Sequence, residues 1–232
     1  FASADLSTAI HAFLLSIFSA SGQSCVAGSR LLLHERIHDE VLGEVARRAA
    51  NIRIGDPLDE ASQMGPLATL SQLQNIQSAV ADATSNGAHL VHGGQQPDGL
   101  GNGWFYEPTV VACPNQDLQI VRNELFGPVV SALRFHDESE AIRLANDTRF
   151  GLAAGIFSND IGRALRVTKA IRSGIIWVNT YRVVSPLAPF GGYKNSGYGR
   201  ESGLQAIYDY TRTKTVWLNT SQIGRASCRE RV

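Results

Sequence analysis

The chain has 232 residues, with 21 basic and 21 acidic side chains, so its formal net charge is zero. This length allows one sizeable core, and a hydrophobic content of 44% excludes a disordered or low-complexity chain. Without a net positive charge or a basic stripe, we expect neither a nucleic-acid nor a membrane partner, and no apolar run approaches the ~20 residues that span a bilayer. Three widely spaced cysteines (Cys25, Cys113 and Cys228) favour a reduced, cytoplasmic setting over a disulfide scaffold.

Apolar periodicity predicts three helices and one strand in the first part of the chain. Ile10, Phe13 and Ile17 recur at helical spacing, and Gly87 follows the third helix as a residue that ends it. The predicted elements are a buried helix over 5–20, a strand over 29–33, and amphipathic helices over 37–49 and 71–86.

The second half alternates between apolar strands and amphipathic helices. Asp137 and Glu140 resemble a capping box at the start of one helix. The predicted order is a strand over 129–135, a helix over 137–146, a strand over 152–157, a helix over 160–171 and a strand over 175–179. Short links between these elements predict parallel pairing and an α/β fold, with functional loops at the carboxyl ends of the strands.

Two short motifs suggest reactive or binding residues. Cys25 ends a Gly-Gln-Ser-Cys turn in which backbone N–H groups can stabilise a thiolate and an oxyanion, although a lone cysteine is more often a small buried hydrophobe. Glu124 and Phe126 precede a Gly-Pro turn, where a carboxylate can bind sugar hydroxyls and an aromatic ring can pack on another ring. The alternative there is a solvated glutamate and a core phenylalanine.

Two further patterns carry less weight. The glycines of residues 189–203 do not have the spacing of a nucleotide phosphate loop, so a tightly folded structural loop is the better interpretation. His34, Glu35 and His38 match the zinc-protease pattern H-E-x-x-H, which requires both histidines on one helix face. Because we expect the helix to begin near Ile37, we predict two surface histidines and no metal site.

Taken together, the motifs resemble the NAD(P)-dependent aldehyde dehydrogenase superfamily over about residues 1–220. They follow one another in the family's order and look closest to its hydrolytic, NAD-type members. They are GQSC ending at Cys25, GDPLDEASQMGPL at 55–67, FYEPTV at 105–110, NELFGPV at 123–129, NDTRFGLAAGIF at 146–157, WVN at 177–179 and PFGGYKNSGYGRE at 189–201.

The resemblance implies a role for five residues. Cys25 would attack an aldehyde as a thiolate and form first a thiohemiacetal and then a thioester. Glu124 would hold the nicotinamide-ribose hydroxyls of NAD or NADP, with NAD favoured, and Phe126 would pack near the same end of the cofactor. Phe190 would line the aldehyde pocket, and Glu201 would assist proton movement or order its loop.

The resemblance also predicts how the chain is organised. Residues 1–213 would form a parallel-sheet catalytic domain, and residues 214–221 a strand that pairs with a neighbouring subunit in a homo-oligomer. Residues 222–232 look like a translated adaptor or cloning read-through. The family's Rossmann-like cofactor domain, oxyanion asparagine and general-base glutamate are not found in the chain, so we expect no NAD-dependent activity from it alone. The alternative is a naturally short, non-catalytic homologue that acts by oligomerising.

Overall fold

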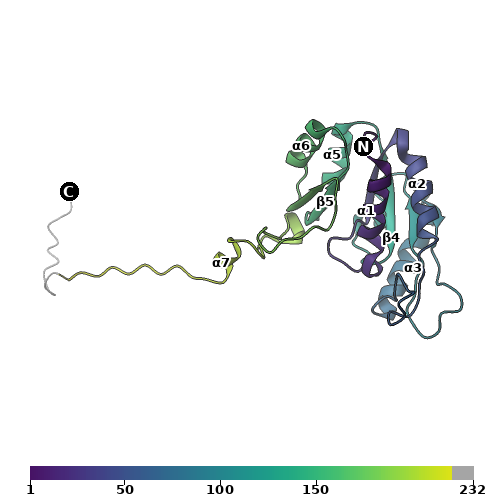
Figure 1. Cartoon of the computed structure of the whole chain (residues 1–232), viewed down its shortest axis with the longest axis horizontal. Helices are drawn as coiled ribbons and strands as arrows, with labels where there is room; N and C mark the ends of the chain where they lie inside the picture. Colours follow the sequence, from purple (N-terminus) through teal and green to yellow (C-terminus); the bar gives the residue numbers. More distant parts are fainter. Residues whose placement is uncertain (221–232) are drawn as a thin grey trace.

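A computed structural model of the chain describes residues 1–220. It has a folded body, residues 1–178, and a C-terminal segment, residues 179–220, whose end from α7 (Ala206–Asp209) onward extends away from the body (Figure 1). Among the described residues, no helix is long and apolar enough to cross a membrane. The prediction for residues 222–232, and the last residue of the predicted strand over 214–221, lie outside the described part of the chain.

The body is built on a four-stranded sheet with the order β1-β4-β3-β2. Its strands are β1 (Arg30–His34), β2 (His89–His92), β3 (Thr109–Ala112) and β4 (Val129–Phe135). Strands β1 and β3 run parallel to β4, and β2 runs antiparallel to β3. Leu32 of β1 lies opposite Leu133 of β4 in the central pair.

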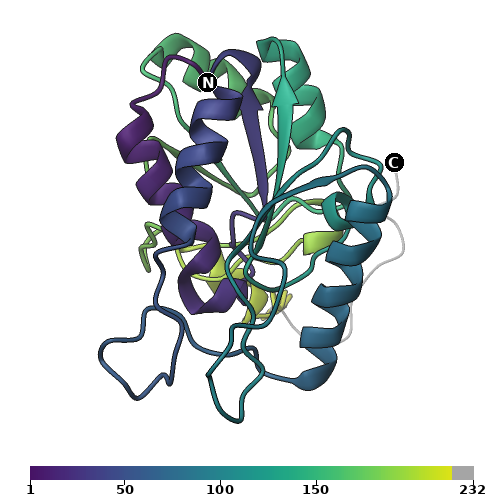
Figure 2. The ribbon, with the colours of Figure 1, turned by 90° about the vertical axis from the view of Figure 1, so that its right-hand side faces the viewer.

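Alternating side chains of the sheet face two separate helical layers, as the two-residue period of a strand requires. Val110 and Val130 pack with α1 (Leu6–Phe18) and α2 (Glu35–Ala49). Val111 and Val129 pack with α3 (Leu70–Ser85) and the short α4 (Gln119–Arg122). Figure 2 shows the pair α1 and α2 on one side of the central strands and α3 on the other.

The remaining strands, β5 (Ala153–Ile156) and β6 (Ile175–Val178), form a separate parallel pair. Helices α5 (Glu138–Asn146) and α6 (Ile161–Ala170) precede these strands, and α6 packs on Ile156. The Phe1 ring meets the Phe135 ring edge-on at 5.2 Å and also packs against the cluster around Ile156, so it connects the two sheets.

The structure confirms the α/β class and every predicted helix, but it corrects the strand pairing. The prediction that strand 129–135 pairs within one sheet with the next two strands is wrong, because β4 lies between β1 and β3. Strands β2 and β3 were not predicted. β2 has only two apolar residues between two histidines, and both strands are fixed by pairing with segments about 20 residues away in the sequence.

The C-terminal segment contains little regular structure. A 3₁₀ turn (η2, Lys194–Ser196) and one helical turn (α7, Ala206–Asp209) are followed by residues 211–220, which form neither helix nor strand. Trp217 is 92% exposed. Pairing of residues 214–221 with a neighbouring subunit therefore remains a prediction.

Candidate active site

Cys25 lies in an exposed turn between α1 and β1. The turn is closed by a hydrogen bond from the Ala27 N–H to the Ser24 carbonyl, at 2.9 Å. Within residues 1–220 the N–H of Cys25 has no hydrogen-bond partner, so it is free to donate to a ligand oxygen. The cysteine thus combines an accessible thiol with a free backbone donor, as nucleophilic attack on a carbonyl requires.

The segment before Cys25 has an uncommon backbone conformation. After α1, the turn η1 (Ser19–Gly22) places Ala20, Ser21 and Gly22 in the left-handed region, with φ values of 53°, 54° and 70°. Side-chain bonds hold this segment to residues 65–68: the Ser21 hydroxyl donates to the Gly65 carbonyl at 2.8 Å, and the Gln23 side chain accepts from the Ala68 N–H at 2.9 Å. Strained backbone held by its surroundings is typical of functional sites.

Gly22 brings the cysteine turn against the loop that leads into β4. A Cβ atom at position 22 would lie 2.0 Å from the Gly127 carbonyl oxygen and 2.7 Å from the Pro128 nitrogen. Only glycine permits this approach. The contact joins two motifs that lie about a hundred residues apart in the sequence. The sequence did not predict that these two motifs touch.

Glu124 and Phe126 lie in this second loop and are both exposed. Phe126 has a left-handed backbone with φ 54°, and the Gln72 side chain of α3 donates to the carbonyls of Leu125 and Phe126. The Glu124 carboxylate has neither an ion pair nor a hydrogen bond within the described part of the chain. An unpaired carboxylate beside an exposed ring on a fixed loop fits the hydroxyls and ring face of a nucleoside.

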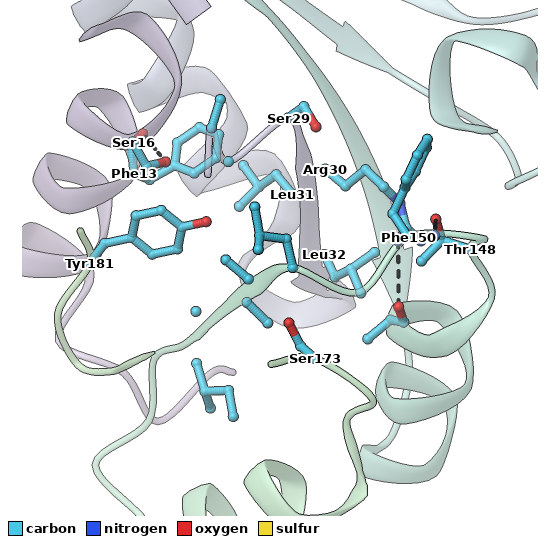
Figure 3. Close-up of a pocket in the computed structure, with 18 of the residues that line it drawn as sticks. Phe13, Ser16, Ser29, Arg30, Leu31, Leu32, Thr148, Phe150, Ser173 and Tyr181 are labelled. Carbon is cyan, nitrogen blue, oxygen red and sulfur yellow. Dashed lines mark hydrogen bonds between the residues drawn. The ribbon is translucent and has the colours of Figure 1, made fainter. Parts of the chain in front are cut away.

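A cavity of about 520 Å³ is lined by Cys25, Glu124 and Phe126 together. Figure 3 shows a part of its wall in which Phe13 comes from α1, Leu31 and Leu32 come from β1, and Tyr181 comes from the loop after β6. Much of this cavity lies between β1 and β5, the facing edges of the two sheets, and is apolar. Cys25 lies in one of the two loops that border the cavity, and Glu124 and Phe126 lie in the other.

Phe190 and Glu201 are not brought to this cavity. Their backbones pair with each other as an isolated antiparallel bridge, with N–H···O distances of 2.7 Å and 2.8 Å. Neither residue lines the cavity. Their predicted roles therefore find no geometric support within the described chain, and they remain proposals.

Tyr181 and Asn195 also line the cavity: Tyr181 belongs to 179–182, a loop predicted from the sequence as a site wall, whereas Asn195 was not singled out. The Tyr181 ring packs against Trp177 with a tilt of 50° and a centroid distance of 4.6 Å, and it occupies the space that a side chain at Gly155 would need. Burial raises the pKa of Tyr181 to about 12. The position of Tyr181, three residues after β6 at a strand's carboxyl end, was the available signal.

The two described cysteines differ in environment. Burial raises the pKa of the Cys113 thiol to about 11, so it remains protonated and unreactive near neutral pH. Cys25 is exposed. Of these two thiols, only Cys25 has the accessibility that a nucleophile needs.

The H-E-x-x-H pattern does not form the arrangement that zinc proteases use. His34 ends β1 and caps α2, its Nδ1 accepting from the Arg36 N–H at 3.2 Å, while His38 lies inside the helix. The prediction of a surface position is wrong for His38, which is 4% exposed because it lies on the buried face of α2 with Val41 and Val45. Its Nδ1 is 2.8 Å from the Asp39 carboxylate. Among residues 1–220, no group of three or more His, Cys, Asp or Glu side chains is placed to hold a metal ion.

Comparison with protein families gives one match, to the aldehyde dehydrogenase family over residues 1–216. Among curated proteins, the chain is 53% identical over 222 residues to (Z)-2-((N-methylformamido)methylene)-5-hydroxybutyrolactone dehydrogenase of Acinetobacter baylyi, covering 95% of this chain and 45% of the relative. It is 43% identical over 225 residues to betaine aldehyde dehydrogenase of Brucella anthropi, covering 96% of this chain and 46% of the relative. The chain thus spans less than half of the length of these relatives.

Among solved structures, a similar one is the crystal structure of betaine aldehyde dehydrogenase from Staphylococcus aureus in complex with NAD+. The TM-score is 0.87 at 38% sequence identity, and the match covers 90% of this chain and 42% of that chain.

Proposed function

The chain belongs to the aldehyde dehydrogenase family, and from this premise we propose that it forms the catalytic portion of an enzyme that oxidises an aldehyde to a carboxylic acid with a nicotinamide cofactor. The observation that carries the proposal is the cavity lined jointly by Cys25, Glu124 and Phe126. The Gly22–Gly127 contact supports it, because it holds the nucleophile loop against the loop that would bind the cofactor.

In the proposed reaction, the Cys25 thiolate adds to the aldehyde carbon and forms a thiohemiacetal. The free N–H of Cys25 donates to the oxyanion that develops on the aldehyde oxygen. Bound nicotinamide supplies the hydride acceptor that turns the thiohemiacetal into a thioester. Water then attacks the thioester, releasing the carboxylic acid and regenerating the thiol, so that aldehyde, oxidised cofactor and water give acid, reduced cofactor and a proton.

The residues present fit the nicotinamide end of such a cofactor. Glu124 offers an unpaired carboxylate to ribose hydroxyls, and the Phe126 ring, 42% exposed, offers an apolar face next to it. NAD is favoured over NADP because related structures hold NAD+. Phe190 and Glu201 are kept as proposed pocket and proton-relay residues.

The test is whether an aldehyde protects Cys25 in the 232-residue chain. Butanal should slow the alkylation of Cys25 by iodoacetamide and leave that of Cys113 unchanged, as followed residue by residue by mass spectrometry. The chain alone, which covers 45% of its relative, should produce no NADH from propanal or benzaldehyde. An unprotected Cys25 would contradict the proposed nucleophile, and clear NADH production would contradict the need for further protein to complete the cofactor site.

A second candidate is a non-catalytic homologue that acts through oligomerisation. The exposed apolar side chains of the C-terminal segment, such as Leu204, Ile207 and Trp217, favour it. The aldehyde experiment separates the two functions, because a non-catalytic homologue should show no protection of Cys25 by butanal.

A further inference from the structure

A second pocket, of about 390 Å³, lies between α1 and the loop that follows β6. Ser16 and Tyr181 border both this pocket and the cavity that contains Cys25. The polar part of its wall is formed by Thr8, His11 and Ser19 on one side and by Thr180 and Arg182 on the other. The function proposed above assigns no role to this pocket.

The pocket follows one face of α1 toward the cysteine turn. Thr8, His11 and Leu15 are spaced by three and four residues and therefore share a helix face. Ser19 continues this face and is the first residue of η1, the segment that leads to Cys25. Arg182 lies beside the last turn of the helix, where its Nη1 donates to the Leu15 carbonyl at 3.5 Å, and Leu15 precedes Ser19 by four residues, about one helical turn.

Arg182 is held in an unusual conformation between two anchors. Its φ is 61°, in the left-handed region that side chains other than glycine, asparagine and aspartate rarely adopt. On one side, Asn179 exchanges two 2.9 Å hydrogen bonds with Ser158, and on the other the Trp177 indole donates to the Val183 carbonyl at 2.8 Å. The loop backbone is therefore anchored on both sides of Arg182, and the Arg182 side chain lines the pocket.

The charge of Arg182 is not neutralised by the protein. Within residues 1–220, Arg182 forms no ion pair, although it is only partly exposed. The pocket wall contains no aspartate or glutamate, and its other ionisable side chain besides Tyr181 is His11, which has no partner either within the described part. A guanidinium without a carboxylate, in a pocket with hydroxyl donors, is suited to an anionic group of a ligand.

We propose that this pocket selects aldehydes that carry a carboxylate. The proposal rests on the proposed function: the aldehyde carbon meets Cys25, and the carboxylate at the other end of a short chain binds the Arg182 guanidinium. The Ser19 hydroxyl lies on the same wall, one helical turn from the Leu15 carbonyl that Arg182 contacts, and can donate to the same group. An aldehyde with a quaternary ammonium group is disfavoured, because it would meet the positive charge of Arg182.

The experiment compares three aldehydes as protectors of Cys25 against iodoacetamide in the full 232-residue chain: 4-oxobutanoate, butanal and trimethylammonioacetaldehyde. We expect half-protection by 4-oxobutanoate at an about tenfold lower concentration than by butanal, the size of one charge-assisted hydrogen-bonded pair, and the weakest protection by the cation. Arg182→Asn, which retains a side chain tolerated at positive φ, should remove the preference, so that 4-oxobutanoate protects Cys25 no better than butanal does. Arg182→Lys should keep part of the preference, and Arg212→Asn, at an exposed arginine of the C-terminal segment, should keep all of it.

The outcomes separate the two proposals. Equal protection by 4-oxobutanoate and butanal, or a preference that survives Arg182→Asn, would overturn the carboxylate proposal and leave Cys25 chemistry intact. Protection by none of the aldehydes would overturn both. Should Arg182→Asn fail to fold by circular dichroism, the wild-type preference decides: it must weaken as ionic strength rises, because screening acts on the charge of Arg182 and not on butanal.

Discussion

The body, residues 1–178, and the C-terminal segment, residues 179–220, differ in how they place their apolar side chains. In the body, the sheet β1-β4-β3-β2 is covered on both faces by helices. Among the described residues, no buried core side chain lies beyond Trp177. The segment instead exposes Val184, Leu204 and Trp217. The body does not bury these apolar side chains, and exposed apolar surface of this kind is typical of an interaction site.

The difference explains why the proposed site is only partly assembled. Cys25, Glu124 and Phe126 lie in loops of the body, whose positions follow from its packed core and from the Gly22–Gly127 contact. Phe190 and Glu201 lie in the segment, where they bond mainly to each other. A residue can be placed to within a fraction of an ångström only if the element that carries it is itself packed.

Truncating a side chain in each region gives the largest expected contrast. Ile17→Ala, in the fully buried face of α1, should lower the free energy of unfolding by about 2–5 kcal/mol through lost burial and a cavity. Trp217→Ala should change it by less than about 0.5 kcal/mol. Urea denaturation of both variants measures this, and a large loss in Trp217→Ala would show that the segment packs against something.

The thiols test exposure within the body. At pH 8, iodoacetamide should modify Cys25 more than about a hundredfold faster than Cys113, because a pKa of about 11 leaves only ~0.1% of the Cys113 thiol ionised. The rate at Cys113 should rise about tenfold per pH unit, since its thiolate fraction increases until the pH reaches its pKa. Peptide mass spectrometry follows both sites, and comparable rates at pH 8 would contradict the buried position of Cys113.

A glycine pair sharpens the comparison at the level of the backbone. Gly22→Ala should cost about 2 kcal/mol more than Gly99→Ala, because the two glycines have similar φ values of 70° and 75° but only the Cβ at position 22 meets backbone atoms. Nothing lies within 4 Å of a Cβ at Gly99. Thermal or urea unfolding provides the difference. Equal costs would mean that the approach of the two loops is not needed for the fold.

Local order along the chain was predictable because it depends on neighbours in the sequence. The periodicity of Ile10, Phe13 and Ile17 predicted α1, and Asp137 caps α5 as its spacing to Glu140 indicates, accepting from the Glu140 N–H at 2.8 Å. The candidate nucleophile and the Glu124–Phe126 loop were also found from short motifs. Strands β2 and β3 lie outside the alternation of strands and helices that predicted β5 and β6, and their pairing with each other and with β4 is a tertiary contact.

The sequence alone therefore determined the helices, the α/β class and the residues with the chemistry of the family. Only the tertiary structure decided that β4 pairs with β1 and β3, that His38 is buried, and that Gly22 brings Cys25 toward Glu124 and Phe126 while Phe190 and Glu201 remain apart. The physical reason is range: helices and caps form between residues three or four apart, whereas sheet order, burial and loop contacts join segments a hundred residues apart.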